Sequence, residues 1–158
     1  MSTKVLLSLA VVLVAHGIAG AAPLVIPAST AYTHPDPNGA RVSIAGISGW
    51  KDAAVKILWF GELKSAGALD AGLQLRLAPN TTSKLRLTID GQAREAEVTG
   101  GSDIVTASFG KFNIREPGYK RFTLEALNDN PPFGDPIAFV LDGDAVAHRT
   151  PCRPTRRP

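Results

Sequence analysis

Cysteine and histidine are scarce in this chain of 158 residues. Cys152 is the only cysteine, and the histidines are His16, His34 and His148. A single thiol excludes an internal disulfide framework. A zinc site needs several His or Cys ligands, and a hydrolytic triad needs a histidine base beside its nucleophile. The two scarcities therefore argue against a disulfide-stapled fold, a zinc centre and histidine-based catalysis.

Long apolar runs are equally rare. The one clear run, Val5–Ala15, follows a short start that carries Lys4 and precedes the small residues Ala19-Gly20-Ala21. It is shorter than the roughly 20 residues of a membrane span. The pattern predicts a signal peptide over residues 1–21, cleaved after Ala21, and hence a secreted or periplasmic protein. An uncleaved membrane anchor is the alternative, and no later segment is apolar enough to cross a bilayer.

The excess of positive charge lies outside the region that is expected to fold. The whole chain carries a formal net charge of +3, but residues 22–148 hold 12 Lys and Arg against 14 Asp and Glu. That region is mildly acidic and has no basic face suited to nucleic acid. The sequence therefore predicts one domain over residues 22–148 and a disordered basic tail over residues 149–158, which contains Cys152.

Short alternating apolar segments, separated by Gly and Pro turns, dominate residues 22–148. We predict about nine strands, a loop over Tyr32–Asn38, and no helix longer than a turn near Asp52–Val55. This pattern is typical of an all-β fold and predicts an antiparallel β-sandwich of the jelly-roll type. The segments expected to be extended are Val25–Ala31, Arg41–Ala45, Val55–Phe60, Leu69–Leu77, Lys84–Ile89, Gln92–Val98, Ile104–Ala107, Phe109–Ile114, Tyr119–Leu127 and Ile137–Leu141.

Local patterns also predict a turn and a core. Asp90-Gly91 between two alternating runs predicts a type I′ hairpin, because both central residues of that turn need positive φ. Val55–Phe60 is apolar on both faces, which predicts an interior strand with Trp59 in the core. The other side chains that the alternation directs into the core are Leu73, Leu75, Leu77, Leu85, Leu87, Ile89, Phe112, Phe122 and Leu124.

Acidic side chains gather in the last two predicted turns. Asp129 and Asp135 belong to the first of these turns, and Asp142 and Asp144 belong to the second. Hard carboxylate oxygens on loops suit Ca²⁺, so the four aspartates form a hypothetical structural calcium site. The alternative is ordinary turn chemistry, because Asp favours turns without any metal. No other cofactor is expected.

Candidate sugar-binding residues are aromatic rings, which stack on sugar rings, and carboxylates, which accept hydrogen bonds from hydroxyls. Trp50 is the first candidate, because it lies on a glycine-flanked loop beside Asp52. Tyr32, Tyr119 and Asp135 complete the set. The alternative for Trp50 is a position that caps the core, where Trp is often found.

Several short motifs occur along the chain in an order and with a spacing that are typical of a known family. They are Ile26-Pro27-Ala28 with Ala31-Tyr32, Gly49-Trp50-Lys51-Asp52, Trp59-Phe60, Leu85 to Gly91, Phe112-Asn113-Ile114 with Pro117-Gly118-Tyr119, and Phe133-Gly134-Asp135. Through these motifs nearly all of residues 22–148 resembles the domain of unknown function 5077 family, a module of secreted, mostly bacterial proteins. The resemblance implies a galactose-binding-like β-sandwich with a carbohydrate-binding-like role, and it implies no particular ligand residues.

Three functions are compatible with these observations. The first is a secreted, non-catalytic module that binds a polysaccharide or another glycan at the cell envelope or outside the cell. The second is a protein–protein or structural module of the envelope. The third and weakest is a glycan-processing hydrolase, which needs two carboxyls about 5 to 10 Å apart across a cleft. Glu95 and Glu97 are instead neighbours on one strand face, so we expect no enzyme.

Overall fold

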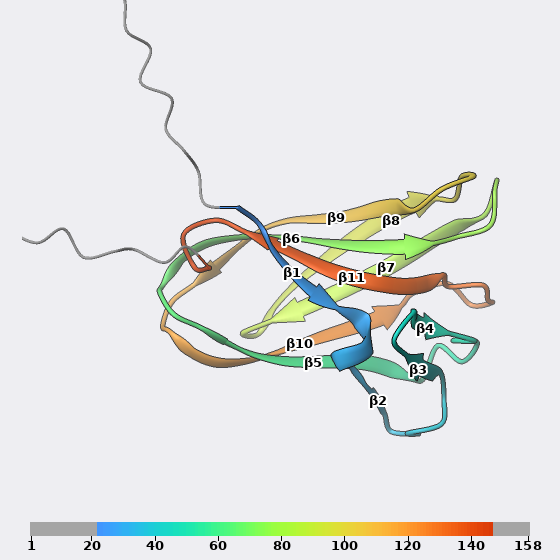
Figure 1. The fold of residues 1–158 in the computed structure, drawn as a ribbon, viewed down its shortest axis with the longest axis horizontal. Coiled ribbons are helices and arrows are strands. Elements are labelled where there is room, and N and C mark those ends of the chain that lie inside the picture. The colour runs from blue at the N-terminus through green and yellow to red at the C-terminus, as the bar shows by residue number, and fades with distance from the viewer. Residues whose placement is uncertain (1–21, 147–158) are drawn as a thin grey trace, which may run out of the picture.

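The computed structural model describes residues 22–146, in which two large antiparallel sheets stack face to face beside a separate two-stranded hairpin (Figure 1). The predicted signal peptide, the predicted basic tail and Cys152 lie outside these residues. The all-β antiparallel sandwich is confirmed. Residues 22–146 contain eleven strands and one short 3₁₀ helix, η1 (Ala28–Thr30), whereas about nine strands were expected.

The first sheet has four strands, in the order β1-β11-β6-β9. Its strands are β1 (Leu24–Pro27), β11 (Asp135–Asp142), β6 (Gly67–Arg76) and β9 (Val105–Ile114). β9 runs without a break through two segments that were predicted as separate strands. Ala71 pairs with Gly110 and Gly72 pairs with Ser108, so Phe109 is an extra residue in β9. The φ of 73° at Gly110 accommodates this bulge, which lets the strand continue.

The second sheet has five strands, in the order β2-β5-β10-β7-β8. Its strands are β2 (Tyr32–His34), β5 (Lys56–Leu63), β10 (Gly118–Ala126), β7 (Thr82–Ile89) and β8 (Gln92–Thr99). β5 lies between β2 and β10, which confirms the prediction of an interior strand. The φ values of 51° at Asp90 and 76° at Gly91 confirm the type I′ hairpin between β7 and β8.

Two predictions near the N-terminus of the fold were wrong. Tyr32–His34, expected as a loop, is the edge strand β2, because it pairs with β5. Arg41–Ala45, expected as one strand, turns back at Ile44-Ala45 to make a hairpin of β3 (Arg41–Ser43) and β4 (Gly46–Ser48). Gly46 allows this turn through a φ of 119°, and an added Cβ there would lie 2.5 Å from the carbonyl oxygen of Pro136. The hairpin therefore packs against β11.

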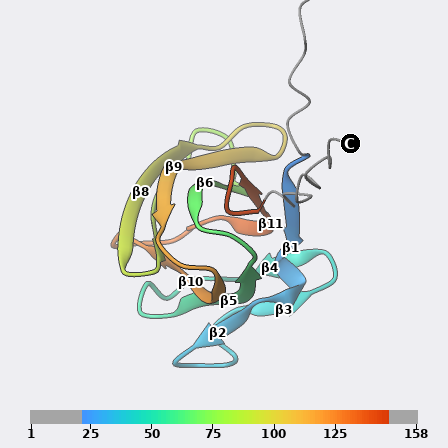
Figure 2. The same cartoon turned by 90° about the vertical axis from the view of Figure 1, so that its left-hand side faces the viewer.

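The core fills the space between the two sheets, which Figure 2 shows as layers. Trp59 and Phe139 meet across it with ring centroids 5.2 Å apart, and Phe122 lies 6.0 Å from Phe139. Trp59 and all nine other side chains predicted for the core are at most 5% exposed, so this prediction is confirmed. At one edge β8 and β9 lie side by side, and two hydrogen bonds between Gln92 and Asn113 join the sheets there.

Candidate functional site

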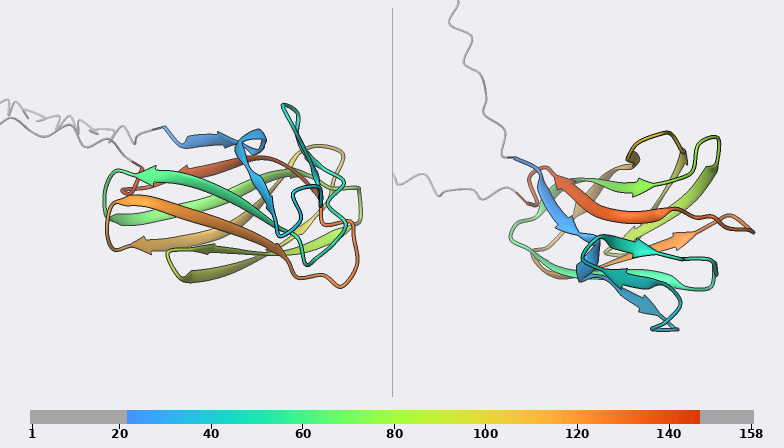
Figure 3. Two further views of the ribbon diagram at one scale, coloured as in Figure 1. Left: turned by 90° about the horizontal axis from the view of Figure 1, so that it is seen from below. Right: turned by 45° about the vertical axis from the view of Figure 1, so that its right-hand side comes forward.

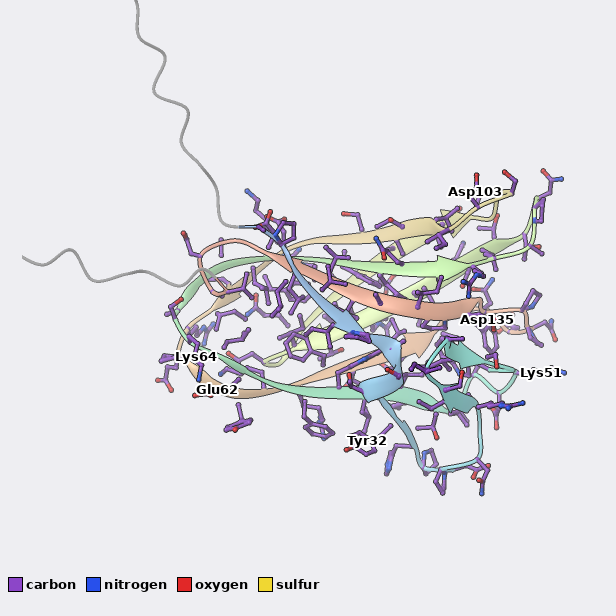
Figure 4. All side chains as sticks on the ribbon, viewed as in Figure 1. Tyr32, Lys51, Glu62, Lys64, Asp103 and Asp135 are labelled. Carbon is purple, nitrogen blue, oxygen red and sulfur yellow. The ribbon has the colours of Figure 1, made fainter. Side chains whose placement is uncertain are left out.

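The sequence-predicted site residues lie in separate parts of the sandwich. Figure 3 shows the β3–β4 hairpin at one end and the two ends of the described chain at the other. Figure 4 shows Lys51 and Asp135 at the hairpin end, and Glu62 and Lys64 at the opposite end. Tyr32 lies on the outer face of the five-stranded sheet, away from both groups. The candidates therefore do not form one site.

Trp50 lies in the core. Its side chain is 3% exposed, and its ring packs against Phe133 with centroids 5.3 Å apart. Nε1 donates to the carbonyl oxygens of Val55, at 2.9 Å, and Asp52, at 3.1 Å. A sugar has no access to the faces of a ring held in this way. Of the two interpretations of Trp50, the position that caps the core is the one that the structure shows.

Asp52 closes the turn that follows Trp50. Its Oδ1 accepts a hydrogen bond from the backbone nitrogen of Ala54 at 2.8 Å, and its carbonyl accepts one from Val55 at 3.1 Å. These contacts form the turn that was predicted near Asp52–Val55. One carboxylate oxygen of Asp52 is thus engaged in turn chemistry.

A shallow groove of about 450 Å³ opens beside this turn, at the hairpin end. Its floor is largely apolar, and the loop that borders it is held by Ser83, whose buried hydroxyl donates to the carbonyl of Phe133 at 2.8 Å. The lining contains one carboxylate, Asp135, and no exposed aromatic ring. The lining residues are Gly49, Trp50, Lys51, Arg76, Leu77, Ala78, Pro131, Pro132, Gly134 and Asp135.

The four aspartates of the hypothetical calcium site do not lie in one place. Asp135 begins β11 and Asp142 ends it. An extended strand of this length separates its ends by roughly 23 Å, so Asp129 and Asp135 cannot share an ion with Asp142 and Asp144. Within residues 22–146, no three His, Cys, Asp or Glu side chains lie close enough together to hold a metal ion.

Three exposed aromatic residues mark the outer face of the five-stranded sheet. Tyr32 is 64% exposed, Phe60 is 59% exposed and Tyr119 is 82% exposed. We call these three residues the aromatic track. The other aromatic side chains of residues 22–146 are all buried, namely Trp50, Trp59, Phe109, Phe112, Phe122, Phe133 and Phe139. Ring surface open to a ligand is therefore confined to one face of one sheet.

Strand register places the aromatic track on a diagonal. Tyr32 on β2 lies opposite Leu58 on β5, and Tyr119 on β10 lies opposite Glu62 on β5. Phe60 lies halfway between Leu58 and Glu62 on the same face of β5. The Cα atoms of Tyr32 and Tyr119 are therefore roughly 16 Å apart, from the usual strand spacing and rise. This span exceeds the length of a single sugar ring.

Two hollows flank the aromatic track on the same face. One, of about 480 Å³, is bordered by Phe60, Tyr119, Thr88 and Arg121 among other residues. The other, of about 340 Å³, is bordered by His34, Lys56, Leu58, Arg121 and Thr123. Arg121 and Thr123 border both hollows. The face thus combines open rings with hydroxyl groups and a guanidinium, which suits a ligand with apolar faces and polar edges.

The carboxylates on this face are held in ion pairs. The pairs are Lys56–Glu125 at 2.7 Å, Arg86–Glu95 at 2.7 Å, Lys84–Glu97 at 3.4 Å, Lys120–Asp90 at 2.9 Å, and Lys64–Glu62. Arg86 donates to Glu95 from both Nε and Nη2, and these hydrogen bonds raise the pKa of Arg86 above its ordinary value. Exposed pairs such as Arg86–Glu95 contribute little to stability. All five pairs nevertheless engage the charged groups that form them.

Sequence reasoning missed Phe60 and Arg121. Phe60 was assigned with Trp59 to an interior strand that is apolar on both faces. Neighbouring residues of a strand point to opposite faces, so the pair Trp59-Phe60 already required one ring to face outward. Arg121 gave no comparable signal, because only the register between β5 and β10 places it beside Phe60.

Solved structures share this sandwich at low sequence identity. The GH26-CBM35 β-(1,4)-mannanase of Podospora anserina is 14% identical, with a TM-score of 0.62 over 82% of this chain and 29% of that one. A family 35 carbohydrate-binding module from Clostridium thermocellum is 13% identical, with a TM-score of 0.57 over 77% of this chain and 98% of that one. The CBM35 of Cellvibrio japonicus Abf62 is 13% identical, with a TM-score of 0.54 over 77% of this chain and 94% of that one.

These likenesses concern the fold alone, and with the two sheets they define its class: an antiparallel β-sandwich like those of the solved carbohydrate-binding modules. The chain belongs to the DUF5077 family, a domain of unknown function, which it matches over residues 25–146. This confirms the resemblance that the sequence motifs indicated. The sequence matches no curated protein. Between residues 22 and 146, no helix has the length and apolar character that crossing a membrane requires.

Proposed function

We propose that this chain is a secreted, non-catalytic module that binds glycan chains through the aromatic track. One observation carries the proposal: all three exposed aromatic side chains of residues 22–146 lie on one sheet face. Aromatic rings that are open to solvent are the groups on which sugar rings stack. The similarity of the fold to carbohydrate-binding modules supports the same function.

The shape of the face favours a chain over a single sugar. The aromatic track crosses three adjacent strands, and its two hollows are shallow and open. An extended glycan can lie along the diagonal and contact each ring in turn. The direct test is a glycan array and a pull-down on insoluble polysaccharides with the full chain. Retention on at least one glycan supports the proposal, and no retention on any glycan rejects it.

The distribution of carboxylates supports a non-catalytic role. A glycosidase needs two carboxyls that face each other across a cleft. The Glu side chains beside the aromatic track are engaged by Lys or Arg, and the groove at the hairpin end has Asp135 as its one lining carboxylate. Incubation with any glycan that the protein retains is expected to release no reducing ends. Release that a Glu125→Gln variant abolishes would contradict this part of the proposal.

Export is the part of the proposal that rests on residues 1–21. A bacterial host that produces the full chain is expected to yield a periplasmic or secreted protein that begins at Ala22. Intact mass and N-terminal sequencing of the fractionated cells measure this directly. A full-length product confined to the cytoplasm would contradict export.

A protein-binding module is the second candidate, and Ile44 favours it. Ile44 lies in the turn of the β3–β4 hairpin and is 99% exposed, and Val42 beside it is 36% exposed. Turns ordinarily carry polar residues or glycine, so a bare β-branched side chain there favours contact with another surface. The simplest partner is a second copy of this chain. A dimer in light scattering that Ile44→Ser dissociates would support this candidate, and a monomer in both proteins would contradict it.

A further inference from the structure

Arg121 lies in the middle of the aromatic track. It is the register partner of Phe60 across β5 and β10. Tyr119 and Thr123 stand two residues before and after it, on the same face of β10. Arg121 is exposed and borders both hollows of this face. A ligand that stacks on Phe60 and Tyr119 therefore comes within reach of its guanidinium.

Arg121 differs from the other cations of this face because it has no carboxylate partner. Lys56, Lys84 and Arg86 each pair with a glutamate of the same face. Lys120 pairs with the carboxylate of Asp90, which borders one of the two hollows together with Arg121. In the part of the chain that the structure describes, no ion pair includes Arg121. The face thus presents one uncommitted cation to a ligand, while its carboxylates are committed.

From this charge distribution we infer that the aromatic track selects acidic glycans, with Arg121 as the residue that binds their anionic group. The inference rests on the proposed function, since it specifies the ligand class of the same face. Sugar rings stack on the aromatic residues, and a uronate carboxylate or a sulfate ester accepts two parallel hydrogen bonds from the guanidinium. Neutral sugars lack the charge that Arg121 would pair with, so they bind more weakly.

Calorimetric titration of the full chain with two matched pairs of polymers tests this inference. One pair is polygalacturonate and its methyl ester, and the other is dextran sulfate and dextran. The protein is expected to bind the charged member of at least one pair about tenfold more tightly, which is the scale of one charge-assisted interaction. The pair that shows the preference tells whether the anion is a carboxylate or a sulfate.

Variants separate Arg121 from unspecific charge attraction. Arg121→Gln is expected to remove the preference for the charged polymer, so that the variant binds the charged and the neutral member of a pair about equally. Arg121→Lys keeps the charge but loses the planar fork, so it should retain only part of the preference. Lys111 is an exposed cation of β9 in the other sheet, and no ion pair within residues 22–146 includes it. Lys111→Gln should therefore keep the full preference.

The outcomes distinguish this inference from the proposed function. Equal affinity for the charged and neutral members of both pairs overturns the selection of acidic glycans. A preference for the charged polymer that persists in Arg121→Gln, or that disappears in Lys111→Gln, also overturns the inference. In these cases the proposed function still stands if Phe60→Ala weakens binding of the polymers. If the protein binds none of the four polymers, the inference is overturned, and the glycan array decides the proposed function separately.

Discussion

The rings of Tyr32 and Phe60 meet edge to face, with 6.2 Å between their centroids and 64° between their planes. Tyr32 belongs to the three-residue edge strand β2, and Phe60 belongs to the interior strand β5. Each ring restricts the other, although both remain more than half exposed. Rings that are ordered before a ligand arrives lose less entropy on binding, so this contact favours the glycan binding that we propose for the aromatic track.

Phe60→Ala tests the centre of the aromatic track. Loss of one stacked ring removes roughly 1–1.5 kcal/mol, so retention on the bound glycan should fall by about tenfold. Because Phe60 is exposed, the free energy of unfolding should change by less than about 1 kcal/mol. Affinity electrophoresis and urea denaturation measure the two effects. Ile44→Ala, which shortens an exposed apolar side chain outside the track, is the control, and equal retention by both variants would remove Phe60 from the site.

The length of the aromatic track predicts a dependence on chain length. Affinity for oligosaccharides of the bound glycan should rise with each added sugar until the chain reaches from Tyr32 to Tyr119, roughly 16 Å. Tyr119→Ala removes one end, so the affinity should level off at shorter chains. Calorimetry with a series of purified oligosaccharides measures both curves. A monosaccharide that binds as tightly as the longest oligomer would contradict an extended site.

Trp50→Phe and Trp59→Phe form a matched pair that tests the role of Trp50. Trp50 donates two hydrogen bonds that Phe cannot replace, whereas the buried Nε1 of Trp59 has no partner among the residues that the structure describes. Trp50→Phe should therefore lower the free energy of unfolding by about 1 kcal/mol more than Trp59→Phe does. Urea denaturation measures the difference. Glycan affinity that falls in Trp50→Phe, with stability unchanged, would instead place Trp50 in the binding site.

Two glycines test the loop geometry for different reasons. Gly91 has a φ of 76° and open space around the position of a Cβ, so Gly91→Ala should cost about 1 kcal/mol of conformational strain. At Gly100 an added Cβ would collide with the backbone carbonyls of Leu77 and Ala78. Gly100→Ala should therefore cost several times more, by roughly 3 kcal/mol or above. Similar midpoints for the two variants in urea denaturation would contradict the close packing at Gly100.

Calcium is expected to have no effect on stability. Asp135 and Asp142 lie at opposite ends of β11, and calcium prefers six to eight oxygen ligands in one place. The melting temperature should therefore be the same in EDTA and in added calcium, as scanning calorimetry measures. Asp142→Asn serves as a control for the second turn. A melting temperature that rises with calcium in the wild type but not in Asp142→Asn would show a separate site at that end.

Local sequence patterns predicted the long strands well, because their signals are local. The Asp90-Gly91 turn and the leucines of β6 and β7 depend only on φ preferences and on alternation along one strand. Short β2 has no such signal, since its three residues become a strand only through pairing with β5. The turn at Ile44-Ala45 was missed for a similar reason. Its glycine is selected by close packing against Pro136, which lies far away in the sequence.

The candidate site was predicted only in part. Tyr32 and Tyr119 lie on the outer face of the five-stranded sheet, where they are open to a ligand, although their role in binding stays a prediction. Trp50 caps the core, which was the alternative interpretation of this residue. Its indole is held inside the fold by a hydrogen bond to the carbonyl of Val55 and by packing against the ring of Phe133. The four aspartates were close in sequence, but the extended backbone between them keeps them apart.

The sequence by itself determined the class of fold and which face of each long strand is buried, because a period of two leaves no choice once one face is apolar. Only the tertiary structure decided which outward residues become neighbours. Tyr32, Phe60 and Arg121 come from three strands that are distant along the chain, and the register of β2, β5 and β10 brings them together. Register depends on pairing between strands, so no single stretch of sequence contains it.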